Sequence, residues 1–155
     1  MHQIMRNGRV HAWDECTNYQ ESLTPPDPTW PIDVRAVAIY IHANLFDENL
    51  MVAKVKRACG IGDNNISGRF RYYVGQGIKE YIDSHRLNLA KRLLDLDHVT
   101  VIAIAFEVGY PSYSAFTKGF SRRVGCTPSV YRGRVQRNVK KKLKKHVQHS
   151  RNGHA

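Results

Sequence analysis

The chain has 155 residues, of which 42% are hydrophobic, and its formal charge at neutral pH is +11. This length gives one domain or two very small ones, with enough apolar side chains to build a core. No apolar run approaches the roughly 20 residues that span a bilayer, and the first residues lack the apolar segment of a signal peptide. We therefore expect a soluble protein that contacts no membrane. The three cysteines, Cys16, Cys59 and Cys126, are odd in number and widely spaced, which indicates reduced thiols.

The positive charge is concentrated at the C-terminal end. Residues 1–30 carry two basic and four acidic residues, whereas residues 132–155 carry nine basic residues and no acidic one. A basic chain indicates an anionic partner, and nucleic acid is the first candidate. Charge alone does not separate DNA from RNA or from a membrane surface.

The N-terminal stretch TPPDPTWP is rich in proline, which stops a helix and favours an extended backbone. We predict a flexible arm over residues 1–30, with Cys16 in a loose polar segment. From Asp33, the expected N-cap, apolar residues recur at helical spacing: Val34, Val37, Ala38, Ile41 and Leu45. Nothing alternates as a strand, so we predict an all-α fold.

An internal repeat defines the organisation of the middle of the chain. Ile66, Phe70, Val74, Gly75 and Tyr81 recur fifty residues later as Phe116, Phe120, Val124, Gly125 and Tyr131. Each copy follows a short helical pattern and a glycine-containing turn, which is the helix-turn-helix plan. We expect one such unit over about 48–75, a linker helix over about 78–95 and a second unit over about 100–125.

The second copy divides into a buried and an exposed face. Phe116, Phe120 and Val124 are expected to pack on the preceding helix through Ile102, Ile104, Ala105 and Val108, with Ser112 as the helix cap. Tyr113, Ser114, Lys118 and Arg122 then project outward, as a helix that enters a DNA major groove requires. The alternative interpretation is a surface helix whose polar residues are only solvated.

The residues of this second unit resemble a known signature. The chain is similar to the DNA-binding domain of the AraC/XylS family of bacterial transcription regulators, whose motif is matched by Ile104, Ala105, Gly109, Tyr110, Phe116, Phe120, Gly125, Thr127, Pro128, Tyr131 and Arg132. The segment Ile78 to Leu94 resembles the family's linker helix. The resemblance implies an AraC-type domain over residues 31–132, followed by a basic tail over 133–155.

The resemblance also implies function. Two recognition helices would enter adjacent major-groove segments of double-stranded DNA, so that a monomer reads a bipartite site. By position, the base-reading candidates are Asn64, Ser67, Gly68, Tyr113, Ser114, Ala115 and Lys118. The phosphate-contact candidates are Arg71, Arg122, Arg123, Lys140, Lys141 and Lys142. The family implies an activator that touches RNA polymerase in the bacterial cytoplasm, on the nucleoid, and the chain looks like the compact members without an effector domain, or like a fragment.

The first unit departs from the family pattern. Lys56 replaces a small alanine, Arg69 replaces an aliphatic residue, and Gly68 offers no side chain to a base. This unit could bind mainly phosphates, and the alternative for the whole chain is an interaction module that kept the fold but lost specific DNA reading.

Other classes of function have little support. No Gly-x-Ser-x-Gly, P-loop or His-Glu-x-x-His pattern is present, so we predict no enzyme and no cofactor. His146, His149 and His154 have no fourth ligand, so we predict no metal. The tail is either a solvated segment or a short basic helix that forms on DNA through Val139, Leu143 and Val147.

Overall fold

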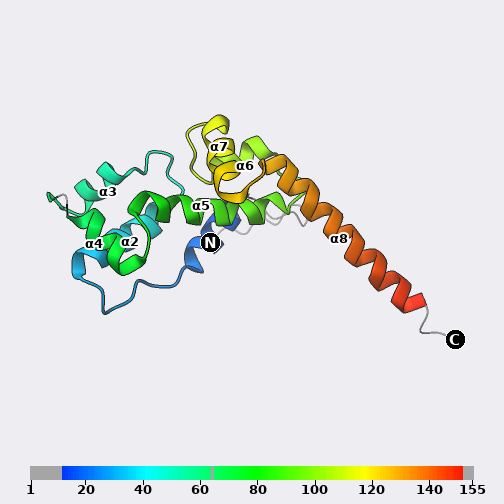
Figure 1. Ribbon diagram of the computed structural model, residues 1–155, viewed down its shortest axis with the longest axis horizontal. Helices are drawn as coiled ribbons and strands as arrows, with labels where there is room; N and C mark the ends of the chain where they lie inside the picture. The colour runs from blue at the N-terminus through cyan, green and yellow to red at the C-terminus, as the bar shows by residue number, and fades with distance from the viewer. Residues whose placement is uncertain (1–11, 64, 152–155) are drawn as a thin grey trace.

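The computed structural model describes residues 12–63 and 65–151, and over these ranges it contains helices and no strand. In chain order the helices are α1 (Ala12–Glu21), α2 (Ile32–Asn44), α3 (Val52–Ala58), α4 (Ile66–Val74), α5 (Ile78–Leu94), α6 (Val101–Glu107), α7 (Tyr113–Val124) and α8 (Pro128–Arg151). The predicted all-α fold is therefore confirmed (Figure 1).

Two helix-turn-helix units are joined by the long helix α5 (Figure 1). In the first unit α2 packs against α3 and α4, and in the second α6 packs against α7. The fifty-residue repeat is visible in the backbone, because α4 ends at Gly75 with φ of 85° and α7 at Gly125 with φ of 81°. Both glycines donate a backbone hydrogen bond of 2.9 Å to the carbonyl four residues earlier. Glycine suits these caps because it adopts the left-handed conformation without steric cost.

The core follows the predicted apolar pattern except at Ile102, and one predicted helix cap is wrong. All five residues predicted for the buried face of α2 are fully buried, as are Phe70, Phe116 and Phe120. Ile102 was predicted to pack under α7, but it is 56% exposed, because the core side of α6 carries Val101, Ile104 and Ala105, followed by the C-cap residue Val108. Asp33 is also not the N-cap of α2, since Pro31 occupies that position.

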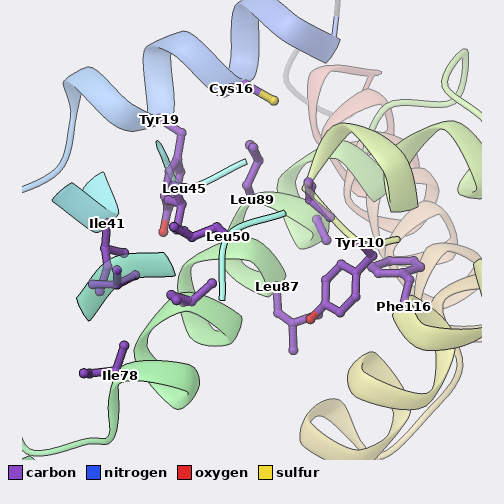
Figure 2. Packing of buried hydrophobic residues seen from close by; sticks show 14 of the residues in the cluster. Cys16, Tyr19, Ile41, Leu45, Leu50, Ile78, Leu87, Leu89, Tyr110 and Phe116 are labelled. Atoms are coloured by element: carbon purple, nitrogen blue, oxygen red, sulfur yellow. The ribbon is translucent and has the colours of Figure 1, made fainter. Parts of the chain in front are cut away.

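Residues 12–21 contradict the prediction of a flexible arm. They form α1, which packs on α5 and α6 and buries Cys16 and Tyr19. Figure 2 shows Tyr19 pointing from α1 into the cluster of buried side chains. The prolines between residues 25 and 31 keep the segment between α1 and α2 free of helix, but they do not prevent the helix that precedes them.

A buried arginine in α5 connects the two units. Arg86 is 5% exposed, and its guanidinium donates hydrogen bonds to the carbonyl oxygens of Leu45, at 2.9 Å, and Asp47, at 2.7 Å. On its other side it lies 5.8 Å from the ring centroid of Tyr110 in the second unit. A Cβ atom at Gly109 would lie 3.0 Å from this guanidinium and 2.9 Å from the carbonyl oxygen of Phe46. The turn of the second unit therefore sits directly against backbone of the first.

Two histidines lie where α1, α2 and α5 meet. The Tyr19 hydroxyl is 2.9 Å from His85 Nδ1, and the Tyr81 hydroxyl is 2.6 Å from His42 Nε2. Burial lowers the pKa of His42, and burial together with the nearby His42 lowers the pKa of His85 to about 4. The His85 ring is therefore neutral in the folded protein near pH 6.

We predict that acid weakens the fold through these histidines. Because the unfolded chain binds a proton at His85 near pH 6.5 and the folded chain only near pH 4, the free energy of unfolding should fall as the pH drops between these values. After allowance for partial solvent exposure, His85 should contribute about 1 kcal/mol of this loss. Urea unfolding of the wild type and of His85→Gln across this range measures the effect. If the free energy of unfolding of His85→Gln falls as steeply on acidification as that of the wild type, the prediction is wrong.

Candidate nucleic-acid interface

The second helix of the second unit, α7, exposes the polar residues that were predicted to project outward. Its first turn is capped by Ser112, whose hydroxyl oxygen accepts a 3.1 Å hydrogen bond from the Ala115 amide, as predicted. Tyr113 is 39% exposed, and Ser114 and Lys118 are exposed beside it. Ala115 is half-buried and packs against the core, so it offers only part of its methyl group to a ligand.

The corresponding helix of the first unit, α4, has a similar buried side but a different exposed one. Ile66 and Phe70 are fully buried, while Ser67 and Gly68 are exposed. A Cβ atom added at Gly68 would meet nothing within 4 Å, so packing does not require glycine there. Asn64 lies outside the described residues.

Tyr72 is a residue of this face that the sequence analysis missed. Its side chain is 81% exposed, and it lies one turn after Gly68 on the same side of α4. The fifty-residue repeat was the available signal, because it aligns Tyr72 with Arg122 and Gly68 with Lys118. The first helix thus carries an aromatic ring where the second carries a cation.

Arg69, which departs from the family pattern, has a structural role. Its Nε donates a 3.0 Å hydrogen bond to Asp33 of α2, and its Nη2 contacts both Asp33 and, at 3.5 Å, Asp63. Asp63 also accepts hydrogen bonds from the amides of Asn65, at 3.0 Å, and Ile66, at 3.2 Å. The start of α4 is therefore held to α2 by an ion-pair network rather than by an aliphatic contact.

Two of the arginines predicted to contact phosphates also make contacts within the protein, both on the first turns of α5. Arg71 of α4 lies 3.4 Å from the Glu80 carboxylate, and Arg123 of α7 donates a 2.7 Å hydrogen bond to the Ser84 hydroxyl. The hydrogen bond from the Gly77 amide and then the charge of Arg71 hold the pKa of Glu80 below its usual value. α4 and α7 thus each have an arginine beside the same part of α5, and Arg71, Arg122 and Arg123 are all exposed.

The basic tail forms one continuous helix with the end of the second unit. Arg132 donates hydrogen bonds to the carbonyl oxygens of Leu94, at 3.1 Å, and Val99, at 2.6 Å, which fixes the start of α8 to the body. From there α8 runs away from the other helices to Arg151 (Figure 1). Lys140, Lys141 and Lys142 are exposed along it. The predicted boundary at residue 133 is therefore not a structural one.

Among residues 12–63 and 65–151 no group of three or more His, Cys, Asp or Glu side chains could hold a metal ion, and no helix is long and apolar enough to cross a membrane. Cys16 is buried rather than loose, and burial, Glu107 and Glu15 raise its pKa to about 12. Its thiol is therefore protonated at neutral pH and a poor nucleophile.

Comparison with known proteins agrees with this geometry. A family profile described as "Helix-turn-helix domain" matches residues 55–134. An AraC-like transcription regulator of Streptomyces lividans is 37% identical over 81 residues, which cover 52% of this chain and 27% of the relative. The virulence regulon transcriptional activator VirF of Yersinia enterocolitica is 33% identical over 81 residues, covering 52% of this chain and 30% of VirF. The chain thus spans less than a third of the length of these two relatives.

Solved structures show the same fold. The DNA-binding domain of the global transcriptional factor AdpA, in complex with a target DNA, has a TM-score of 0.62 and 22% sequence identity to this chain. The match covers 68% of this chain and 95% of that one. The fold and the family profile together define a DNA-binding protein of the helix-turn-helix class. Within this class, the chain belongs to the AraC/XylS family of transcription regulators.

The Ser112 cap provides a test of the structure of α7. Ser112→Ala should lower the free energy of unfolding by about 1 kcal/mol, because the Ala115 amide loses its acceptor. Ser114→Ala, on the exposed side of the same turn, is the matched control and should change stability by less than about 0.5 kcal/mol. Chemical denaturation measures both, and equal effects would show that Ser112 does not cap the helix.

Proposed function

We propose that the chain is a sequence-specific activator of transcription that reads two adjacent major-groove segments with α4 and α7. The observation that carries the proposal is the arrangement of these two helices. Each buries its aromatic side, exposes its polar side, and contacts the same two turns of α5 through an arginine, Arg71 or Arg123. A fixed pair of helices suits two major-groove segments about one helical turn apart.

The two helices are proposed to contribute unequally. α7 offers Tyr113, Ser114 and Lys118, and an ammonium group pairs well with guanine O6 and N7. α4 offers Ser67, Gly68 and Tyr72, of which only the tyrosine is long, and Arg69 is engaged with Asp33. Arg122 and the lysines of α8 supply phosphate contacts.

Selection of bound sites from a random DNA pool tests the proposal as a whole. We expect an asymmetric site of about two helical turns, because both reading helices belong to one chain. A strict palindrome, or no enriched site, would contradict it. The role of activator, proposed because VirF is named as one, requires contact with RNA polymerase. Placing the selected site upstream of a promoter should raise transcription in a purified system, and lowered transcription would indicate a repressor.

Base discrimination should be concentrated under α7. Lys118→Ala should relax the preference at one or two positions of that half-site by about 1 to 3 kcal/mol, if Lys118 makes a good base contact. Ser67→Ala in α4 should change base preference by less. Site selection with the wild type and both variants measures this, and a uniform loss of affinity in Lys118→Ala would assign Lys118 to phosphate.

The α8 lysines should act on all sequences alike. Replacing Lys140, Lys141 and Lys142 with glutamine should weaken binding to selected and unrelated DNA equally, because phosphates carry no sequence information. Each lost phosphate contact should flatten the slope of log affinity against log salt by about 0.9. Binding titrations at several salt concentrations measure the slope, and an unchanged slope would show that these lysines do not touch DNA.

A further inference from the structure

Two apolar surfaces are left uncovered in the described part of the chain. The first is the α1–α6 groove, an open hollow of about 390 Å³ whose apolar lining includes Trp13, Phe46 and Phe106. Trp13 is 59% exposed, Phe106 is 51% exposed, and Ile102, one turn before Phe106 on α6, is 56% exposed. Apolar side chains that gather in this way on a surface are typical of a protein contact.

The edge of this groove is acidic in an otherwise basic chain. Glu107 lines the groove, and both Glu107 and Glu15 lie close enough to the Cys16 thiol to raise its pKa. The chain as a whole carries 24 lysines and arginines against 13 acidic residues, so an acidic edge stands out. A partner that fits here needs apolar side chains flanked by cations.

The second uncovered surface has this composition. Val139, Leu143 and Val147 are 50%, 61% and 57% exposed and lie four residues apart on α8. At 100° per residue they form one apolar stripe, which Lys140, Lys142 and Lys144 flank, and the opposite side of the helix carries Arg134, Arg137, Lys141 and Lys145. No acidic residue occurs from Arg132 onward. The stripe runs about 12 Å along the helix.

We propose that α8 of one copy docks in the α1–α6 groove of a second copy, with Val139, Leu143 and Val147 against Trp13, Ile102 and Phe106. The helix does not reach the groove of its own chain, because it is fixed at Arg132 and runs away from the body (Figure 1). Pairing of two α8 helices through their stripes would bring two sets of cations together without one acidic partner. Docking in the groove instead places the lysines that flank the stripe, Lys140, Lys142 and Lys144, near Glu15 and Glu107.

The contact joins two different surfaces, so a pair of bound copies leaves one groove and one helix open. Such a head-to-tail contact adds copies in one direction and imposes no twofold symmetry on the DNA beneath them. It also leaves the basic side of α8 facing outward. The inference concerns protein–protein contact alone, and it is independent of the proposed function.

Complementation between two full-length variants tests the docking without DNA. The groove variant carries Ile102→Gln and Phe106→Gln, and the helix variant carries Val139→Gln, Leu143→Gln and Val147→Gln, all at exposed positions where glutamine keeps the helix. The matched control is Ile32→Gln, since Ile32 is 78% exposed on α2, away from both surfaces. Circular dichroism establishes that each variant is as helical as the wild type.

Sedimentation velocity at rising protein concentration gives the readout. Wild type and Ile32→Gln should exceed the monomer mass of 17.8 kDa, whereas each variant alone should stay at it. An equal mixture of the two variants should form a complex of twice that mass, because one retains the helix and the other the groove. Wild type that stays monomeric throughout overturns the proposal, and so does a mixture that stays monomeric where the wild type associates. If the wild type stays monomeric but binds vesicles of anionic phospholipid, the proposal is overturned and the stripe binds a lipid surface instead.

Discussion

The relation between the two units depends on the environment of Arg86. Its guanidinium is removed from water, so its hydrogen bonds to the carbonyl oxygens of Leu45 and Asp47 are obligatory rather than incidental. These carbonyls belong to the connection between α2 and α3 in the first unit, while Gly109 and Tyr110 of the second unit close over the other side of the same group. Because the first unit accepts its hydrogen bonds and the second unit covers it, moving either unit away from Arg86 would expose a buried charge. This constraint contributes to the arrangement of α4 and α7.

Within that frame the two units achieve the same helix arrangement by different chemistry. The second uses a serine cap and an aromatic contact between Tyr110 and Phe116, whose ring centroids are 5.4 Å apart (Figure 2). The first uses the carboxylates of Asp33 and Asp63 around Arg69. Ion pairs near the surface weaken with salt, whereas aromatic packing does not. The position of α4 on α2 should therefore respond to ionic conditions more than that of α7 on α6.

Periodicity predicted much of this fold, and the failures have physical causes. The buried phenylalanines and the glycine caps repeat after fifty residues, so their positions could be predicted from the sequence. α1 was missed because its buried residues, Cys16 and Tyr19, stand in a polar stretch beside prolines, and a packed helix needs only one apolar edge. Ile102 was misplaced because every position of α6 from Val101 to Phe106 is apolar, so its inner face cannot be identified from the pattern. The partners of Arg71 and Arg123 depend on contacts between distant segments, which no local pattern encodes.

Gly68 has a consequence for how this chain could change its targets. The position lies on the exposed side of a recognition helix with no neighbour within 4 Å of an added Cβ atom, and its backbone needs no left-handed conformation. Most residues would therefore fit without disturbing the core, and many would favour the helix over glycine by up to about 1 kcal/mol. Mutations that alter function commonly lower stability, but here a new side chain would add to it. A change at the one codon for Gly68 could therefore add a side chain to the exposed side of α4 without lowering the stability of the fold.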